Sequence, residues 1–152
     1  MPSSVIIETQ GTKAVLAQIR KYMSAEALAQ GELKALAEYT RSVAYSLAPK
    51  DTGGGARRIQ AAVVFNRAEV FTKDAHMVVM EMGRKPGSAA PPTEALAGWM
   101  ARHGKPQSEA FVVARAIGRR GLRARRFMAR AAEAAKTRLD VATRNIKVKL
   151  ER

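Results

Sequence analysis

The segment IQAAVVFNRAEVFTKDAHMVVMEM, residues 59–82, decides the fold class. Its Val, Ile, Met and Phe side chains are concentrated in three short runs, Ile59–Phe65, Glu69–Thr72 and His76–Met82. Turn-type residues interrupt these runs at Asn66–Arg67 and Lys73–Asp74, and short apolar runs with such boundaries are typical of strands. We therefore predict an antiparallel meander of about three strands, half-buried beneath a long helix.

The chain before this segment is predicted to be helical from residue 12 to residue 48. Val15, Ile19 and Met23 recur at helical spacing, and a second helical stripe runs from Leu28 to Leu47. Ser24 is suited to cap the second helix, and Gly31 is expected to mark a bend or a local weakness. Pro49 ends the helical region, because the residue before a proline is pushed out of the α conformation.

The chain after this segment is also predicted to be mainly helical. Thr93 is a suitable N-cap for a short helix that carries Trp99 and ends at Gly104. Ser108 caps the next helix, which stops near Gly118 or Gly121. A final helix at about 125–150 carries a narrow, Ala-rich apolar stripe.

Together these elements predict an α+β fold with long N-terminal helices, a small antiparallel sheet of about three strands, and C-terminal helices that include a long final one. The length of 152 residues fits a single domain, 1–152. Within it, residues 1–11 form an N-terminal arm or, through Val5–Ile7, an edge strand.

Charge is the strongest compositional signal. The formal net charge is +14, and residues 100–152 hold 15 Lys or Arg against 4 Asp or Glu. Such a field favours polyanionic partners, whether nucleic acid, an acidic protein surface or anionic lipid, although a merely solvated basic helix is the alternative. No apolar stretch approaches the ~18 residues that a membrane span requires, so no membrane partner is expected.

Catalytic and cofactor motifs are not found in the sequence. There is no cysteine, and the two histidines, His76 and His103, have no companion at metal-ligand spacing. Neither glycine-rich stretch matches a phosphate-binding loop or a dinucleotide fingerprint, and no serine sits in a nucleophile elbow. Glu81 is a single carboxylate, better explained by pairing with a nearby arginine than by catalysis. We expect no enzyme activity, no cofactor and no bound metal.

An arginine segment, RAIGRRGLRARRFMAR, spans residues 115–130 and contains no acidic residue. Guanidinium groups are suited to bidentate contact with carboxylates and phosphates. Two glycines interrupt the segment and Phe127 is its only aromatic residue, so neither a continuous DNA-reading helix nor a stacking surface for single strands is expected. The residues that we expect to contact DNA or an acidic partner are Arg115, Arg119, Arg120, Arg123, Arg125, Arg126 and Arg130.

Four stretches, in order, resemble one family. LAPKDTGGGARRI (47–59) resembles the L-A-P-x-D-T-G-x-L-R-x-S-I stretch of tail-completion, or head–tail joining, proteins of long-tailed bacteriophages. VVMEMGRKPG (78–87) resembles the family's strand that ends in Glu, an aromatic residue and Gly. The pair Pro91–Pro92 resembles its proline-marked turn, and IGRRGLRARRFMARAAEAA (117–135) resembles its glycine–arginine approach to a final helix. The resemblance covers a core of about residues 33–140.

The resemblance implies a structural protein of the virion neck, made in the host cytoplasm. Such a protein forms a ring, hexameric by resemblance, at the head-proximal end of the tail. Its partners would be itself, the tail terminator or tail tube protein, the head connector or stopper protein, and DNA in the channel. The residues that the resemblance places at subunit or neck-partner contacts are Asp51, Thr52, Gly53, Arg57, Arg58, Arg84, Lys85, Pro86, Pro91, Pro92 and Phe127.

The sequence also departs from the family pattern. Gly54-Gly55 replaces a step that usually contains Leu, which predicts a more mobile loop, and Met82 stands where an aromatic residue is common. Arg126 and Arg130 stand where prolines are frequent. The alternative function is a small basic protein that binds the phosphate backbone of nucleic acids by itself.

Overall fold

The computed structural model describes residues 12–65 and 67–151. It is mostly helical with one small sheet, so the α+β prediction is confirmed. The order of elements is α1 (Thr12–Leu47), α2 (Gly54–Arg57), β1 (Gln60–Val64), β2 (Arg67–Phe71), α3 (Ala75–Met82), α4 (Thr93–Arg102), the 3-10 helix η1 (Gln107–Glu109), α5 (Ala110–Arg120) and α6 (Phe127–Glu151).

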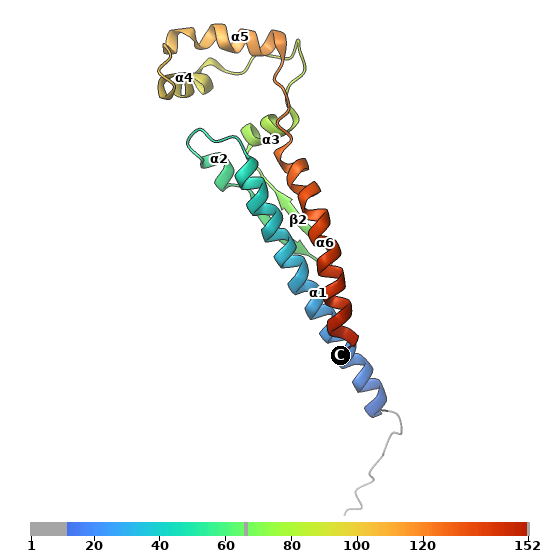
Figure 1. The fold of residues 1–152 in the computed structure, drawn as a ribbon. Coiled ribbons are helices and arrows are strands. Elements are labelled where there is room, and N and C mark those ends of the chain that lie inside the picture. The colour runs from blue at the N-terminus through green and yellow to red at the C-terminus, as the bar shows by residue number, and fades with distance from the viewer. Residues whose placement is uncertain (1–11, 66, 152) are drawn as a thin grey trace, which may run out of the picture.

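Helices α1 and α6 lie antiparallel and form a long stalk (Figure 1). Small side chains fill their contact: Ala44 and Ala48 of α1 are buried together with Ala131 of α6. Alanine has the highest helix propensity and lets two helix backbones approach closely. The Ala-rich stripe of the final helix therefore packs within its own chain.

Strands β1 and β2 form an antiparallel hairpin that packs on α1. Their register pairs Gln60 with Phe71 and Val64 with Arg67. Helix α1 contacts both strands, and Gln30 of α1 donates a hydrogen bond of 2.7 Å to the backbone oxygen of Phe65 at the hairpin turn. The first two predicted strands and their position against the long helix are thus confirmed.

The third predicted strand, His76–Met82, is wrong, because these residues form helix α3. Asp74 caps the helix, its carboxylate accepting hydrogen bonds from the backbone N–H groups of His76 at 3.0 Å and Met77 at 3.2 Å. Gly83 ends the helix with φ at +75°. His76–Met82 is a mainly apolar run of seven residues, which is too short for its spacing to separate a strand from a buried helix.

Helix α1 is one continuous helix of 36 residues, so the predicted helical region is confirmed, whereas a new helix start at Ser24 is wrong. The Ser24 hydroxyl donates to the backbone oxygen of Lys21 inside the helix, a local bond that serine can make without ending it. The predicted strand Val5–Ile7 lies outside the described residues. The final helix starts at Phe127, two residues later than expected.

Helices α4, η1 and α5 form a separate lobe at one end of the stalk (Figure 1). Met100 is fully buried in it, and the Trp99 ring is half-buried and stacks on His103 with ring centroids 4.4 Å apart. Helix α4 begins at Thr93 behind Pro92, and Gly104 follows its end with φ at +64°, as expected for that position.

The lobe is joined to the stalk where two chain segments cross. Arg84 and Leu122 exchange two backbone hydrogen bonds of 2.8 and 2.9 Å. Gly83 and Gly121 precede these residues, each with φ at +75° and ψ near 180°, a conformation open essentially only to glycine. A Cβ at Gly83 would stand 2.4 Å from the oxygen of Leu122, and one at Gly121 would stand 2.3 Å from the oxygen of Arg84. The crossing therefore needs both glycines.

We predict that Gly121→Ala destabilises the protein by more than about 2 kcal/mol, because it combines a disfavoured φ with a backbone clash. Gly87→Ala is the matched control: Gly87 also has a positive φ of +79°, but a Cβ there meets nothing within 4 Å. It should cost only about 1–2 kcal/mol. Urea unfolding followed by circular dichroism measures both, and equal losses would show that the close approach at the crossing does not matter.

Candidate functional site

The predicted site residues fall around the junction where α3, the lobe and the start of α6 meet. Glu81 on α3 holds this junction together. Its two carboxylate oxygens accept hydrogen bonds from the backbone N–H groups of Met128 at 2.8 Å and Ala129 at 3.0 Å. These are the second and third residues of α6, whose N–H groups have no partner within the helix. Arg126, which precedes the helix, offers no side-chain acceptor, so Glu81 caps α6 from another element.

Two backbone hydrogen bonds strengthen the same contact. The N–H of Arg125 donates to the oxygen of Met80 at 2.8 Å, and the N–H of Arg126 donates to the oxygen of Glu81 at 3.3 Å. Arg126 itself has φ at +51°. Proline, whose φ is fixed near −65°, cannot adopt this value, so the conformation at this position excludes proline.

Phe127 lies inside this junction and has 0% of its surface exposed. It shares a buried cluster with Ala56, Ile59 and Met77. A Cβ on Gly55 would come within 2.6 Å of the Met77 sulfur, so the glycine permits the close packing of α2 on α3. Phe127, expected at a partner contact, instead packs the interior of the junction and offers no surface to a partner in this conformation.

The loop that follows α1 connects the stalk to the lobe. The Asp51 carboxylate accepts a hydrogen bond of 2.9 Å from Nε of Arg102 in α4 and is also bound by the other end of that guanidinium. This hydrogen bond is the main cause that lowers the pKa of Asp51 below its ordinary value. Thr52 and Arg57 are exposed, and Gly53 takes φ at +78° ahead of α2. This loop thus links the end of α1 in the stalk to α4 in the lobe.

A second ion pair fixes α2 against α3. Arg58 donates to Asp74 at 2.7 Å, the same carboxylate that caps α3. Burial opposes ionisation of Asp74, but the hydrogen bonds from Arg58 and from the N–H of Met77 outweigh it and lower the pKa of the carboxyl.

The segment between α3 and α4 is a turn held by the lobe. The Arg84 guanidinium donates to the backbone oxygen of Ala89 at 2.7 Å, and the Ser88 hydroxyl donates to that of Lys85 at 2.6 Å. Gly87 donates to the oxygen of Gly118 in α5 at 2.9 Å. Lys85, Pro86 and Pro92 are exposed, whereas Pro91 is half-buried.

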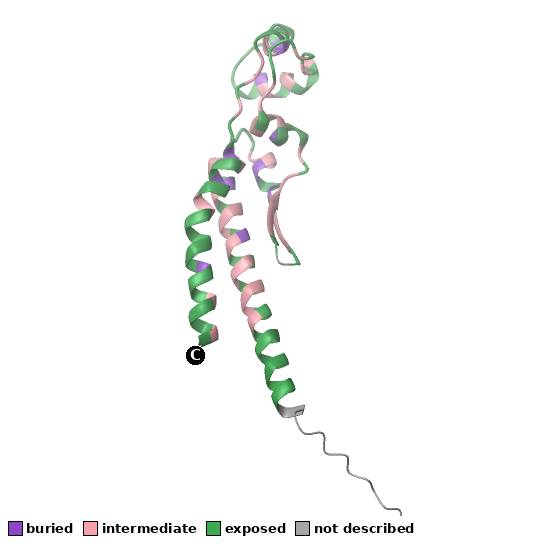
Figure 2. Cartoon of the chain, turned by 90° about the vertical axis from the view of Figure 1, so that its right-hand side faces the viewer, coloured by how far each residue is buried: buried purple, intermediate pink, exposed green. Residues whose placement is uncertain are grey.

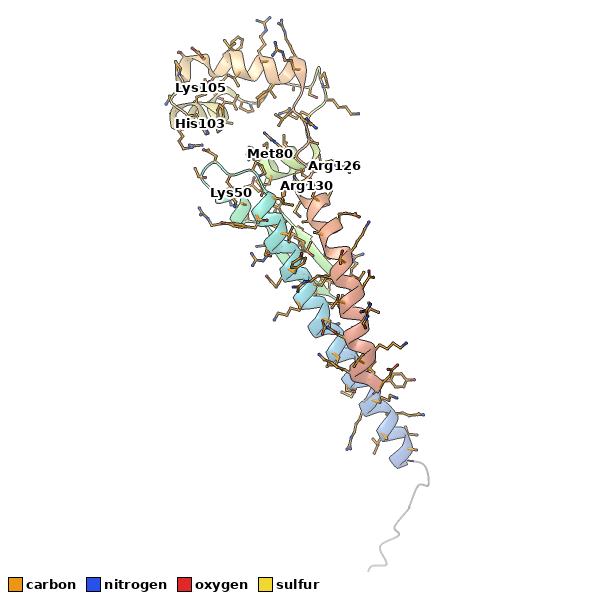
Figure 3. All side chains as sticks on the ribbon, in the orientation of Figure 1. Lys50, Met80, His103, Lys105, Arg126 and Arg130 are labelled. Atoms are coloured by element: carbon orange, nitrogen blue, oxygen red, sulfur yellow. The ribbon has the colours of Figure 1, made fainter. Side chains whose placement is uncertain are left out.

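All seven arginines of the predicted contact set have exposed side chains. In the described part of the chain, none of these seven arginines forms an ion pair. Arg126 and Arg130 lie beside the junction near Met80 (Figure 3). The set extends along α5 and the crossing segment to the start of α6. An exposed guanidinium that forms no ion pair remains available to an external anion.

An open groove of about 510 Å³ borders this set in the lobe. It lies between the segment from Gly87 to Thr93 and helix α5. Its lining is mostly apolar and includes Phe111 and Pro91, while Arg115 and Arg119 are its charged lining residues. The groove can therefore accept apolar and acidic groups together.

The structure thus brings the elements that carry the predicted residues to the end of the stalk at which the lobe lies. Two residues with structural roles, Glu81 and Asp74, were not predicted as helix caps. The signal for Asp74 was available, because Asp just before an apolar run is typical of an N-cap. Among the described residues there is no group of three or more His, Asp or Glu side chains suited to a metal ion, and no helix is long and apolar enough to cross a membrane.

The chain matches no protein-family model, no curated protein and no solved structure.

We predict that Glu81→Ala lowers the free energy of unfolding by about 1–2 kcal/mol, because two N–H groups of α6 lose their acceptor. Glu133→Ala serves as the control, since Glu133 is an exposed residue of α6 whose only ion pair, with Lys136, lies on the surface. Urea unfolding measures both variants. A loss at Glu81 no larger than at Glu133 would contradict the capping role.

Acidification should weaken the contact between α2 and α3. The pKa of Asp74 is lowered on folding, so its contribution to stability is present above the unfolded value of 3.8 and is lost as the pH falls through the lower folded value. Asp74→Asn keeps a capping side chain but cannot titrate. The variant should therefore be less stable than the natural chain at neutral pH, and the difference should shrink as the pH falls below 3.8. A difference that stays constant on acid titration would contradict this.

Proposed function

We propose that this chain is a structural, non-catalytic protein of a tailed bacteriophage virion. It forms a ring at the head-proximal end of the tail and joins the tail to the head connector. Its partners are further copies of itself, the tail terminator or tail tube protein and the connector or stopper protein. DNA passes through the ring.

The observation that carries this proposal is that three of the four stretches resembling the tail-completion family meet in one packed junction. Residues 47–59 supply Ala48, Ala56 and Ile59 to the buried cluster, residues 78–87 supply Glu81, and residues 117–135 supply Phe127 and the capped start of α6. Stretches that lie far apart in the chain thus depend on each other for packing and hydrogen bonds. This supports reading them together as one resemblance rather than as separate coincidences.

The proposed contact surface is the exposed arginine set around this junction. Its guanidinium groups form no ion pair with the described residues, so binding an external anion requires no internal ion pair to break. Carboxylates of a neck partner and phosphates of the DNA both present oxygen acceptors at suitable spacing. The loops around Asp51 and Arg84 are already held by hydrogen bonds within the chain. They would therefore lose little conformational entropy on docking.

The same arginines support a second candidate, a basic protein that binds the phosphate backbone of nucleic acids without a ring. Affinity for duplexes of any sequence that falls steeply with salt would favour this candidate, because each phosphate contact releases counterions.

Electron microscopy of particles assembled with and without this chain tests the first proposal. We expect finished tails without a neck ring, which fail to join filled heads, when the chain is missing. Normal infectious particles without the chain would overturn the virion role.

A pair of triple variants locates the contact. Arg119, Arg120 and Arg123 are changed to Gln in one variant, and the exposed Lys136, Arg144 and Lys147 of α6 in the other. Both lose the same charge, so joining of heads to tails should fall only in the first. Equal losses would show that net charge, and not the junction, is responsible.

A further inference from the structure

Helix α1 is longer than the helix that covers it. Lys149, near the end of α6, forms an ion pair of 3.5 Å with Glu32 of α1. Toward the N-terminus, α1 continues past the end of α6 (Figure 1). Residues 14–24 are all exposed, and half-buried positions begin only at Ala25 and Leu28 (Figure 2). We call residues 12–24 the overhang.

The overhang carries five large apolar side chains. Val15, Leu16, Ile19, Tyr22 and Met23 are between 47% and 76% exposed. At 100° per residue they all fall within a sector of about 120° around Ile19. Contiguous apolar patches of this kind on a folded chain mark contact surfaces.

This face continues the face of α1 that is buried higher in the stalk. Ile19 and Ala37 are eighteen residues apart, which is five turns at 3.6 residues per turn. Ala37 and Ala44 are buried, and they line, with residues of β2 and α6, a groove between these elements. Gln30, eleven residues after Ile19 and on nearly the same side of α1, donates to the hairpin turn. The overhang thus presents a side of α1 that the hairpin and α6 cover higher in the stalk, at a level where both have ended.

The order of the five side chains is symmetric about Ile19. Leu16 and Tyr22 are three residues before and after it, and Val15 and Met23 are four before and after it. When two copies of the overhang run antiparallel with the two Ile19 side chains in contact, Leu16 meets Tyr22 and Val15 meets Met23 of the other copy. One two-fold contact therefore covers all five, as an isologous interface requires.

We propose that the overhang binds a second copy of this chain, forming an antiparallel helix pair centred on Ile19. The partner's helix lies on the side of α1 that is buried higher in the stalk and is uncovered at the level of the overhang. Arg20 and Lys21 lie about 100° and 200° further round the helix from Ile19. They point away from the pair and do not oppose its formation.

This pairing does not depend on the proposed neck role. Neighbours in a cyclic ring use two different surfaces, whereas the overhang pair uses the same surface twice. A free chain that pairs through Ile19 can therefore exist whether or not particles need the protein, and the two proposals can fail separately.

Light scattering of the full-length chain provides the first test. The chain has a mass of 16.5 kDa, and we expect twice this mass for the natural chain and a single-chain mass for Ile19→Lys. Val112→Lys is the control, since Val112 is an apolar residue of α5 with 64% of its surface exposed. It should leave the dimer intact. Unchanged circular dichroism would show that Ile19→Lys still folds, as expected for an exposed position.

Disulfide trapping tests the direction and the register, because the chain contains no cysteine. Ile19→Cys should form a disulfide-linked dimer under mild oxidation. Val15→Cys alone should not, since the two copies of residue 15 would be about 12 Å apart along the axis, beyond the ~7 Å limit between the Cα atoms of a disulfide. A mixture of Val15→Cys and Met23→Cys chains should form the mixed disulfide.

Three results would overturn the proposal. The first is a single-chain mass for the natural protein at every concentration, or an oligomer that Ile19→Lys leaves unchanged. The second is efficient linkage of Val15→Cys to itself, which indicates a parallel pair. The third is a single chain that sediments with vesicles of anionic lipid and loses this binding in Ile19→Lys, which would make the overhang a membrane-surface helix.

Discussion

The carboxylate of Glu81 fixes the start of α6 at the end of the stalk that carries the lobe. It binds the N–H groups of Met128 and Ala129, which have no partner within the helix. A carboxylate near a helix N-terminus also interacts favourably with the helix dipole. Because Glu81 belongs to α3, the start of α6 is fixed relative to α3, and Phe127 is directed into the cluster that Met77 and Ile59 complete.

Local sequence signals were sufficient for the elements whose boundaries are set by nearby residues. Three elements could be predicted: the hairpin, the helix that Gly104 follows, and the helix before Gly121. Turn residues and glycines determine the backbone conformation at their own positions, so they mark such boundaries directly. Helix α3 was missed because Val78, Val79 and Met80 favour a strand by residue type, whereas the Asp74 cap and Gly83 fix a helix. In α1, contacts with the hairpin and α6 outweigh the local weakness at Gly31.

The site was predicted in part for the same reason. Exposure of the arginines follows from their charge, and the structure agrees. Contacts over long separations, such as Glu81 with Met128, Asp51 with Arg102 and Arg58 with Asp74, could not be predicted, because they depend on which elements the fold brings together. Phe127 shows the opposite case: the resemblance places it at a partner contact, whereas its side chain packs inside the junction.

The crossing at Arg84 and Leu122 has a consequence for how this chain can change over evolutionary time. The segments that enter and leave the lobe are hydrogen-bonded to each other at its base, so the ends of the stalk segments are adjacent whatever the lobe contains. Insertions, deletions or an exchange of the whole lobe would leave the path of α3 and α6 unaltered. Specificity for different partners could therefore diverge rapidly in the lobe while the stalk beneath it stays the same.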